Sequence, residues 1–277
     1  TEIYTSLFVG SVKMCIRDSS RLAIRFAVGA ATLIALTVLE RRFPLRRPRH
    51  RANRRLVVNL ALGAIGFAGV TAAYGVVVLA AVDWSADRGL GLVRWLTLPG
   101  WVAAPLIVIL LDYTLWIWHW LNHRVGLLWR FHAAHHADLD LDASTALRFH
   151  PGELLLSLPF RAVQVVVIGA TLWPLFIWEG LLFVFTQFHH SNLRLPERAD
   201  RALSQVIITP RLHGIHHSRR PAELHANFGT LLSVWDRLHR VRVTDVAQDS
   251  IDIVRPHQAD PCAPGVTTNS PDKPEPI

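Results

Sequence analysis

Histidine is the residue type in this chain whose number and spacing point to chemistry. Eleven of the fifteen histidines lie between His119 and His217. Ten of these eleven form an HxxxH pair, two HxxHH clusters and one adjacent pair, and the eleventh is His150. In chain order these groups are His119 and His123, then His132, His135 and His136, then His189 and His190, then His213, His216 and His217.

The spacing within these groups predicts metal binding. On a helix, residues three or four positions apart lie on one face, so an HxxxH pair directs both imidazoles to one point. An HxxHH cluster directs two of its three rings in the same way. Imidazole is a strong ligand for iron, zinc, copper and nickel, and eight or more such ligands are too many for one ion. The sequence therefore predicts a site for two metal ions.

Long apolar segments predict that this site belongs to a membrane protein. Residues 56–82 form a run of 27 residues without a charged side chain. A bilayer needs about 20 such residues in a helix. Residues 22–39 and 101–118 are predicted as two further spans, in which Arg25 and Asp112 are the charged residues.

A fourth apolar region, residues 154–188, is too long for one crossing. A continuous helix of this length would measure about 52 Å, against a hydrocarbon core of about 30 Å. The stretch Gly169–Pro174 offers a break near its middle, so we predict a helical hairpin. The predicted fold is an all-α integral membrane protein with three transmembrane helices plus this hairpin, and with a cytoplasmic histidine-rich helical cap.

The distribution of arginine predicts the orientation. Residues 40–55 contain eight arginines and one glutamate, whereas residues 83–94 contain two aspartates and two arginines. Positively charged loops remain in the cytoplasm, so residues 40–55 and all the histidine groups are expected on that side. The net charge of +8 is accordingly assigned to membrane orientation, and no nucleic-acid partner is expected.

Several motifs resemble the fatty acid hydroxylase and sterol desaturase superfamily. They are DY at 112–113, HWLNHR at 119–124, LWRFHAAHH at 128–136, ASTALRFHPGE at 143–153, HSN at 190–192, TPRLHGIHHS at 209–218, NFG at 227–229 and WDRL at 235–238. The resemblance covers residues 105–240. Members of this superfamily are membrane-bound non-haem di-iron enzymes that use dioxygen to hydroxylate, or sometimes desaturate, lipid substrates.

The resemblance implies two iron ions and a set of ligands for them. The implied ligands are His119, His123, His132, His135, His136, His190, His213, His216 and His217. Trp120 stands where the family usually has arginine, and residues 237–239 depart from the usual ending, which weakens any assignment of substrate. The short gap between His123 and His132 favours the hydroxylase branch over the acyl-CoA desaturases.

Four further residues are expected to support the ligands by hydrogen bonding. Asp112 precedes His119 by two helical turns, and orienting that ring is its expected role, with a structural pairing to arginine as the alternative. His150 is expected to orient a ligand imidazole. The remaining two are His189 and Asn192, which flank or follow His190. His225 and His239 are expected to be ordinary polar residues.

The implied chemistry needs electrons and a membrane lipid. The sequence contains no GxGxxG dinucleotide motif and no cysteine cluster for an iron–sulfur centre, since its two cysteines are Cys15 and Cys262. We therefore expect an external carrier, either a ferredoxin or a cytochrome b5-type protein, with its reductase. The expected location is the bacterial inner membrane, with dioxygen as co-substrate and the active site facing the cytoplasm.

Three other classes remain as alternatives: a zinc hydrolase, a b-type haem redox carrier and a metal-binding transporter. An HExxH motif is absent from the sequence, which disfavours the first. Paired histidines within facing spans would be needed for the second, and polar residues at the membrane midplane for the third.

Four regions are expected along the chain. Residues 1–19 are interpreted as a sequencing artefact or a disordered tail, because the only methionine is Met14 and the following residues match the translation of a library transposon end. Residues 20–100 form the expected N-terminal transmembrane region and residues 101–245 the expected di-iron domain. Residues 246–277 are proline-rich and are expected to be disordered.

Overall fold

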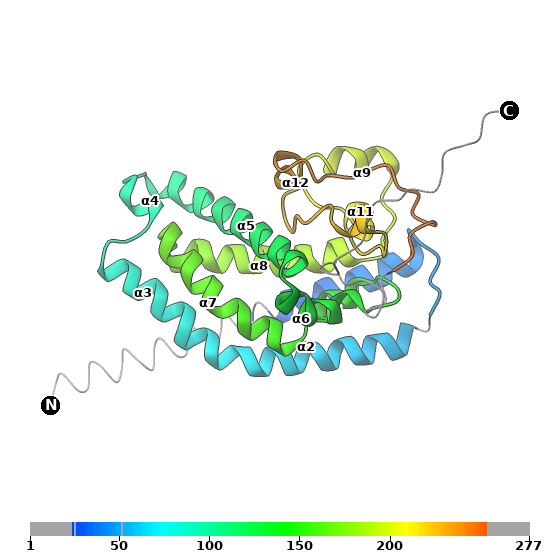
Figure 1. Cartoon of the computed structure of the whole chain (residues 1–277), viewed down its shortest axis with the longest axis horizontal. Helices are drawn as coiled ribbons and strands as arrows, with labels where there is room; N and C mark the ends of the chain where they lie inside the picture. Colours follow the sequence, from blue (N-terminus) through cyan, green and yellow to red (C-terminus); the bar gives the residue numbers. More distant parts are fainter. Residues whose placement is uncertain (1–23, 25, 51, 254–277) are drawn as a thin grey trace.

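A computed structural model describes residue 24 and residues 26–50 and 52–253 of the chain (Figure 1). The described residues form helices and three isolated β-bridges, with no strand among them. The expectation for residues 1–19 lies outside the described residues. A first helix covers residues 26–42. The later helices are α2 (Ala52–Tyr74), a π-helical turn η1 (Gly75–Leu79), α3 (Ala80–Asp87), α4 (Leu92–Trp95), α5 (Gly100–Arg124), α6 (Gly126–His136), a 3₁₀ helix η2 (Ala143–Leu147), α7 (Pro151–Ile168), α8 (Leu172–His190), α9 (Glu197–Leu203), α10 (Pro210–His216), α11 (Pro221–Leu224) and α12 (Val234–Leu238).

The long helices make this chain an integral membrane protein. Among the residues that the structure describes, three segments are long and apolar enough to cross a bilayer: Ala52–Thr71, Gly100–Arg124 and Pro151–Ile168. The first two confirm the predicted second and third spans. The third is the first arm of the predicted hairpin. The predicted first span begins in residues that the structure does not describe, and its remainder is helical.

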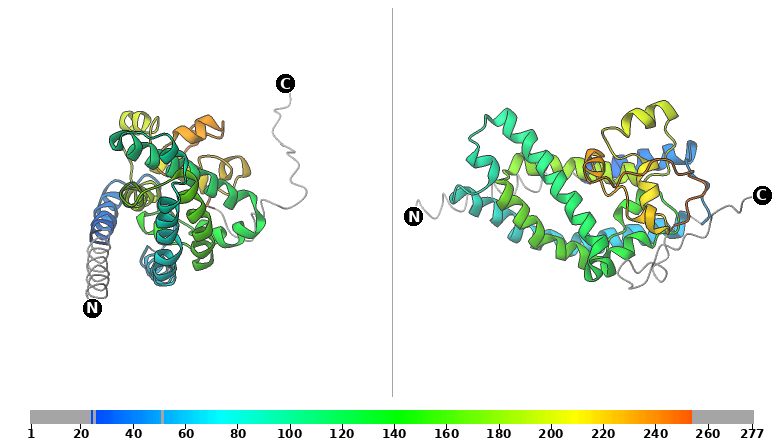
Figure 2. Two further views of the ribbon diagram at one scale, coloured as in Figure 1. Left: turned by 90° about the vertical axis from the view of Figure 1, so that its left-hand side faces the viewer. Right: turned by 45° about the horizontal axis from the view of Figure 1, so that its top comes forward.

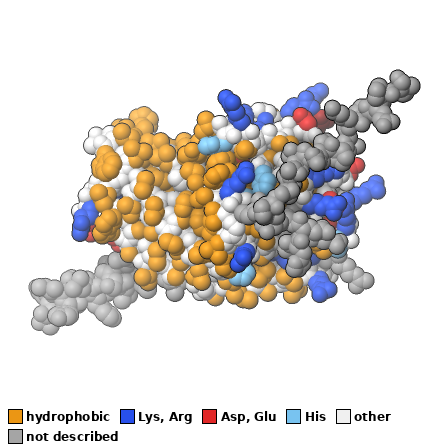
Figure 3. Space-filling model, viewed as in Figure 1, with side chains coloured by type: hydrophobic (Ala, Val, Ile, Leu, Met, Phe, Trp, Pro, Cys, Tyr) orange, Lys and Arg blue, Asp and Glu red, His pale blue; other side chains and the backbone are white. Residues whose placement is uncertain are grey.

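The outer surface of the long helices is apolar. Ile65 on α2 is 59% exposed and Val163 on α7 is 59% exposed. Figure 3 shows hydrophobic side chains over the end of the molecule that carries the long helices, and most of the arginine side chains over the other end. Large apolar side chains are stable at an outer surface that faces lipid, so this division places the long helices in the bilayer.

The predicted hairpin is confirmed, and glycine makes its turn. Helix α7 ends at Ile168, Gly169 adopts a left-handed conformation with φ 77°, and α8 begins at Leu172. The turn packs directly on the loop before α4, because a Cβ atom on Gly91 would lie 2.1 Å from the Cα of Gly169. Both residues have positive φ, which favours glycine.

A buried apolar core joins the transmembrane helices to one another. Val78 of η1, Leu111 of α5, Val165 of α7 and Trp178 of α8 are all fully buried. Between helices in a bilayer such side chains stabilise the bundle by close van der Waals packing. These contacts fix the helix ends from which the histidines project.

Except for α3 and α4, the short helices gather at one end and form a cap. Figure 1 and Figure 2 show α9 (yellow-green) and α12 (orange) at the end of the molecule opposite α4. Part of the predicted disordered tail belongs to the cap: Ile251 is 4% exposed, and Asp252 pairs with Arg49 and Arg219. The expectation of disorder is therefore wrong for residues 246–253, because one isoleucine and several polar contacts anchor them. Residues 254–277 lie outside the described residues.

The hairpin turn gives a testable prediction for stability. In Gly169→Ala the new Cβ would lie 3.0 Å from the Cα of Gly91, at a backbone angle unfavourable for alanine. We expect a loss of about 1–2 kcal/mol, measured by unfolding in detergent. Gly180→Ala is the matched control, since a Cβ there meets no atom within 4 Å and alanine favours helix. Equal stability of Gly169→Ala and the original protein would contradict this account of the turn.

Candidate metal centre

Four helices deliver the histidines to one region between the membrane helices and the cap. The C-terminal ends of α5 and α8 supply His119, His123 and His190. The other two helices, α6 and α10, lie in the cap and supply the two HxxHH clusters.

The nitrogen atoms of these rings converge in two groups. In each group the candidate ligand atoms all lie within 4.8 Å of one another. The first group comprises His119, His123, His132, His136 and His216, and the second comprises His135, His190, His213 and His217. The structure thus brings together the nine histidines that the family resemblance implied as ligands.

Helical spacing explains how each HxxHH cluster divides between the groups. His132 and His136, four residues apart on α6, face the first group, and His135 faces the second. The division is reversed in the other cluster, where His213 and His217 face the second group and His216 the first. Because residues four apart share a face and the intervening residue is rotated away, one helix can contribute to both groups.

Burial keeps these rings neutral. The pKa values of His135, His136, His213, His216 and His217 lie well below their usual range, because burial disfavours the charged form and the neighbouring histidines repel it. A neutral imidazole has a lone pair on one nitrogen, which is the form that binds metal.

In the second group, two ring nitrogens face each other and neither carries a proton. His135 and His190 each have Nδ1 beside a backbone carbonyl, at 3.2 Å from Arg148 and 2.7 Å from Thr186. Nδ1 is therefore the protonated nitrogen in both rings, and the two Nε2 atoms, 2.9 Å apart, both present lone pairs. Such an arrangement is repulsive unless a cation lies between the nitrogens.

The first group shows the same need for a cation. The Nε2 atoms of His119, His123, His132, His136 and His216 are buried and have no hydrogen-bond partner among the described residues. A buried polar atom without a partner costs free energy, and a metal ion would satisfy these nitrogens. The residues present therefore fit the binding of metal by both groups.

The outer nitrogens of the rings are held by a second set of contacts. Nδ1 of His119 lies 2.7 Å from the carbonyl of Phe228, and Nδ1 of His216 lies 2.9 Å from that of Ala226. His132 has a carboxylate partner, with its Nδ1 2.9 Å from Oε1 of Glu153. Contacts of this kind fix the ring orientation and raise the basicity of the ligand.

Glu153 contacts a candidate ligand, and the sequence did not indicate this contact. It lies in the first turn of α7 and is 5% exposed. The glutamate appears in the family-like motif at 143–153, and its position after an HPG sequence could have suggested a role. Nothing in the spacing, however, indicates that it meets His132, which is 21 residues earlier.

Of the four residues expected to support the ligands, three contact backbone groups instead, namely Asp112, His150 and Asn192. Asp112 accepts hydrogen bonds from the backbone of Leu231 and Leu232 and from Nε1 of Trp235, and not from His119. Its carboxylate lies where the loop before α12 crosses α5, so it positions that loop. Neither the expected orientation of His119 nor a pairing with arginine is observed for it.

His150 and Asn192 also serve the backbone. Nδ1 of His150 accepts a hydrogen bond from the backbone of Gly152 at 3.0 Å and caps α7, so the ring is not available to orient a ligand. The side chain of Asn192 exchanges two hydrogen bonds with the backbone of Arg46, both 2.8 Å long. His150 is exposed. Asn192 is buried and joins the end of α8 to the segment after the first helix.

His189 lies beside the second group without belonging to it. Its Nδ1 lies 3.0 Å from the carbonyl of Thr230, and its ring centroid is 4.1 Å from that of His213. This placement agrees with a supporting role, exerted by packing against a candidate ligand.

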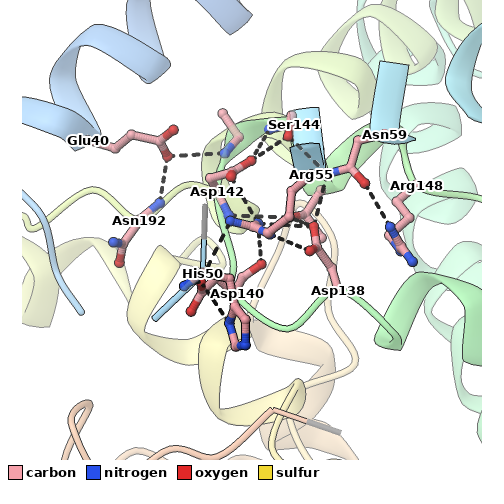
Figure 4. Close-up of polar contacts among 12 residues, drawn as sticks. Glu40, His50, Arg55, Asn59, Asp138, Asp140, Asp142, Ser144, Arg148 and Asn192 are labelled. Atoms are coloured by element: carbon pink, nitrogen blue, oxygen red, sulfur yellow. Dashed lines mark hydrogen bonds and ion pairs between the residues drawn. The ribbon is translucent and has the colours of Figure 1, made fainter. Parts of the chain in front are cut away.

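A network of charged and polar side chains fastens the segment that follows His136 (Figure 4). Arg55 of α2 donates to Asp138 at 2.6 Å and pairs with Asp142 at 2.9 Å. Asp138 also accepts a hydrogen bond of 2.9 Å from Asn59. Burial alone would raise the pKa of Asp138, but the contact with Arg55 outweighs it and the pKa is lowered. The network connects α2 to the end of the histidine-bearing α6.

Glu40 extends this connection to α8. Its Oε2 accepts hydrogen bonds from the backbone of Ala143 at 3.1 Å and of Asn192 at 2.8 Å. The first helix is thereby tied to the segments that follow His136 and His190 (Figure 4).

A cavity of about 450 Å³ opens beside the two groups. Five of the nine rings line it: His119, His132, His135, His190 and His213. The rest of its wall is mostly apolar and comes from membrane helices, including Phe67 of α2, Leu115 of α5, Leu158 of α7 and Phe183 of α8. Such a cavity can hold an apolar chain next to the histidine centre.

Comparison with known proteins identifies the family. Residues 104–241 match the sequence model of the fatty acid hydroxylase family. The chain is 33% identical over 132 residues to an ornithine lipid hydroxylase of Rhizobium tropici, a match that covers 47% of this chain and 39% of that protein. An alkylglycerol monooxygenase of Homo sapiens is 26% identical over 138 residues, which cover 50% of this chain and 29% of that protein.

The chain belongs to the fatty acid hydroxylase family through residues 104–241. An alkylglycerol monooxygenase of Xenopus tropicalis gives a further match, 28% identical over 127 residues, covering 46% of this chain and 27% of the relative. The chain thus spans less than half the length of these curated relatives. No solved structure matches it significantly.

The contact between Glu153 and His132 gives a prediction for metal affinity. In Glu153→Leu the ring loses its outer acceptor, and we expect the affinity for metal to fall about 10–100-fold. Glu153→Gln keeps an acceptor oxygen and should restore most of the affinity. Bound metal is measured by elemental analysis against free metal concentration.

Glu197→Leu is the control, because Glu197 is exposed and pairs only with Arg201 among the described contacts. Unchanged metal affinity in Glu153→Leu would show that the contact is not needed.

Proposed function

We propose that this protein is a membrane-bound di-iron oxygenase that hydroxylates, or desaturates, a lipid. The observation that supports it most is the position of two groups of neutral histidines in the wall of an apolar cavity formed by membrane helices. The relatives named as a lipid hydroxylase and as alkylglycerol monooxygenases favour the same class of reaction.

The donor set suits iron. All nine candidate ligands are imidazoles, and imidazole binds iron as well as zinc or copper. Two groups imply two ions, His119, His123, His132, His136 and His216 holding one and His135, His190, His213 and His217 the other. When bound, the iron pair would supply the reductive activation of dioxygen, the co-substrate, for attack on an unactivated C–H bond. Residues 101–245 form the proposed di-iron domain, and the preceding region 20–100 adds the wall of α2.

The chain's own residues have separate tasks in this proposal. The backbone carbonyls of Phe228 and Ala226 and the carboxylate of Glu153 orient three of the rings. Apolar residues of the membrane helices bind the lipid chain and exclude water from the centre, so that an oxidising species reacts with substrate. The substrate is accordingly a membrane lipid that enters from the bilayer.

The proposed location is the bacterial inner membrane, with the histidine centre and the cap on the cytoplasmic side. The eight arginines of residues 40–55 support this orientation, and these residues contact the cap through Arg46 and Arg49. The proposed electron source is an external ferredoxin or cytochrome b5-type carrier with its reductase, since the sequence carries no motif for a nucleotide or an iron–sulfur cofactor.

Substitution of one histidine in each group tests the proposed function. We expect the purified protein to hold two iron ions per chain and to hydroxylate lipid only with dioxygen and a reductant. His216→Ala and His217→Ala should each lower bound iron and abolish hydroxylated lipid, because each removes a ligand from a different group. Iron is measured by elemental analysis and the product by mass spectrometry of the cell lipids.

His150→Asn is the matched control for these substitutions. Asparagine is a favourable residue at a helix N-terminus, so it should replace the capping contact and leave iron and product unchanged. Full lipid hydroxylation by His216→Ala or His217→Ala would contradict the proposed function of the histidine groups.

The orientation can be tested separately. A reporter fused after Leu195, which follows the end of α8, should be cytoplasmic. Alkaline phosphatase, which is active only outside the cytoplasm, should therefore be inactive at this point, and green fluorescent protein should fluoresce. An active phosphatase there would place the histidine centre on the opposite side of the membrane.

A further inference from the structure

An aromatic cluster begins at an exposed histidine and leads inward from the surface. His239 follows α12 and is exposed, and its ring stacks on the indole of Trp116 with centroids 4.0 Å apart. Its Nε2 lies 3.2 Å from the hydroxyl of Tyr113. Trp116, by contrast, is only 4% exposed. The stack therefore connects solvent to a buried indole.

Hydrogen bonds continue from this indole to the first histidine group. Nε1 of Trp116 donates to Oδ1 of Asp236 at 2.8 Å, and the same carboxylate accepts the backbone N–H of Gly229 at 3.1 and 3.2 Å. This N–H belongs to the peptide bond between Phe228 and Gly229. The carbonyl of that peptide lies 2.7 Å from Nδ1 of His119.

The phenyl ring of Phe228 provides a second connection in parallel. Its centroid lies 6.0 Å from that of Trp116 and 5.6 Å from that of His119, edge-on in both cases. Electron transfer through a protein becomes slower with every gap between atoms, and covalent bonds, short hydrogen bonds and aromatic rings shorten those gaps. The path from His239 to His119 consists of such contacts throughout.

The surface around the start of this path is suited to an acidic protein. Val234 is 38% exposed and Leu238 62% exposed, which gives α12 an apolar face. Arg237 and Arg240 are exposed and lie on either side of Leu238 in the chain, and Figure 3 shows arginine side chains concentrated at this end of the molecule. An apolar centre with a charged rim is typical of a protein–protein interface, and the charge favours partners of opposite sign.

We infer that an acidic one-electron carrier docks on α12 and that its electrons pass through Trp116 and Asp236 to His119. The inference rests on the proposed function, for which it specifies the entry of electrons. In each encounter the carrier would lose one electron, which iron held by the histidine groups would accept. Two encounters would supply the two electrons that hydroxylation by dioxygen requires beyond those of the substrate, and two protons from solvent would complete the water that is formed.

The route is tested by following oxidation of a reduced, acidic [2Fe–2S] ferredoxin by the iron-loaded full chain in rapid mixing without oxygen. Trp116→Leu and His239→Ala should slow the reaction, the first by about tenfold, equivalent to about 1.4 kcal/mol in activation free energy. Trp101→Leu is the matched control, because Trp101 begins the same helix and is 81% exposed at its other end. Dithionite with a small mediator should reduce all variants at the same rate, since it needs no docking.

Docking is tested by charge reversal and needs no activity. Arg240→Glu should weaken binding of the ferredoxin about tenfold and reduce its dependence on salt, measured on the protein with and without iron. Arg88→Glu, in the turn that follows α3, is the matched control. If Arg240→Glu weakens binding to anionic vesicles and leaves ferredoxin binding unchanged, the face contacts lipid headgroups and the inference is wrong.

Equal rates of ferredoxin oxidation by His239→Ala and the original protein would also overturn the route. Because His239 is exposed, the His239→Ala variant should fold even if Trp116→Leu does not. The outcome is separable from that of the proposed function. A protein that accepts ferredoxin electrons through this path and hydroxylates no lipid would contradict only the proposed reaction. A protein that hydroxylates lipid with unaltered electron uptake in the variants would contradict only the route.

Discussion

Convergence of neutral imidazoles in a closed space is the constraint on which the rest of this structure depends. In the second group, the Nε2 atom of His190 lies 2.9 Å from the Nε2 atom of His135 and also 2.9 Å from that of His213. The protonated Nδ1 atoms of His135 and His190 point away, toward backbone carbonyls. Lone pairs that face one another are stable only around a cation. Metal binding and the packing of the cap on the membrane helices are therefore coupled, as in other sites whose ligands come from several elements.

This coupling explains the buried carboxylates around the centre. Asp112 and Asp236 do not touch the ligand rings, yet they bind the loop between Phe228 and Trp235 to α5. That loop supplies the carbonyl that orients His119. Burial raises the pKa of Asp236 to about 7, even though the hydrogen bonds from Trp116 and Gly229 favour the charged form. The hydrogen bonds that the buried carboxylate accepts hold the loop in one position and offset part of the free-energy cost of its burial.

The same arrangement relates the centre to a lipid. Five helices surround the cavity: the first helix, α2, α5, α7 and α8. The polar network of Arg55, Asp138 and Glu40 joins the first helix and α2 to the segments that follow His136 and His190. The wall of the cavity and the metal centre are thus parts of one assembly. A change in the packing of the membrane helices would alter both the shape of the cavity and the geometry of the rings.

The sequence by itself determined the class of fold, and its resemblance to a known family implied the candidate members of the metal centre. Runs of apolar residues specify membrane helices because backbone polar groups in lipid must be paired within a helix. Histidines spaced by three and four specify a shared face because the helical repeat is local. For these reasons the second and third spans and the break in the hairpin within residues 169–174 followed from the order of residues, whereas the set of nine histidines was implied by the resemblance to the family.

Only the tertiary structure decided which partner each side chain has. Glu153 meets His132, and the carbonyl of Phe228 meets His119 across 109 positions of the chain. Asp112 and His150, which spacing placed near ligands, bind backbone groups. Part of the tail is anchored by Ile251 and Asp252 on the cap. Such contacts depend on how distant helices pack against one another, and spacing along one helix carries no information about the surface that the other helix presents.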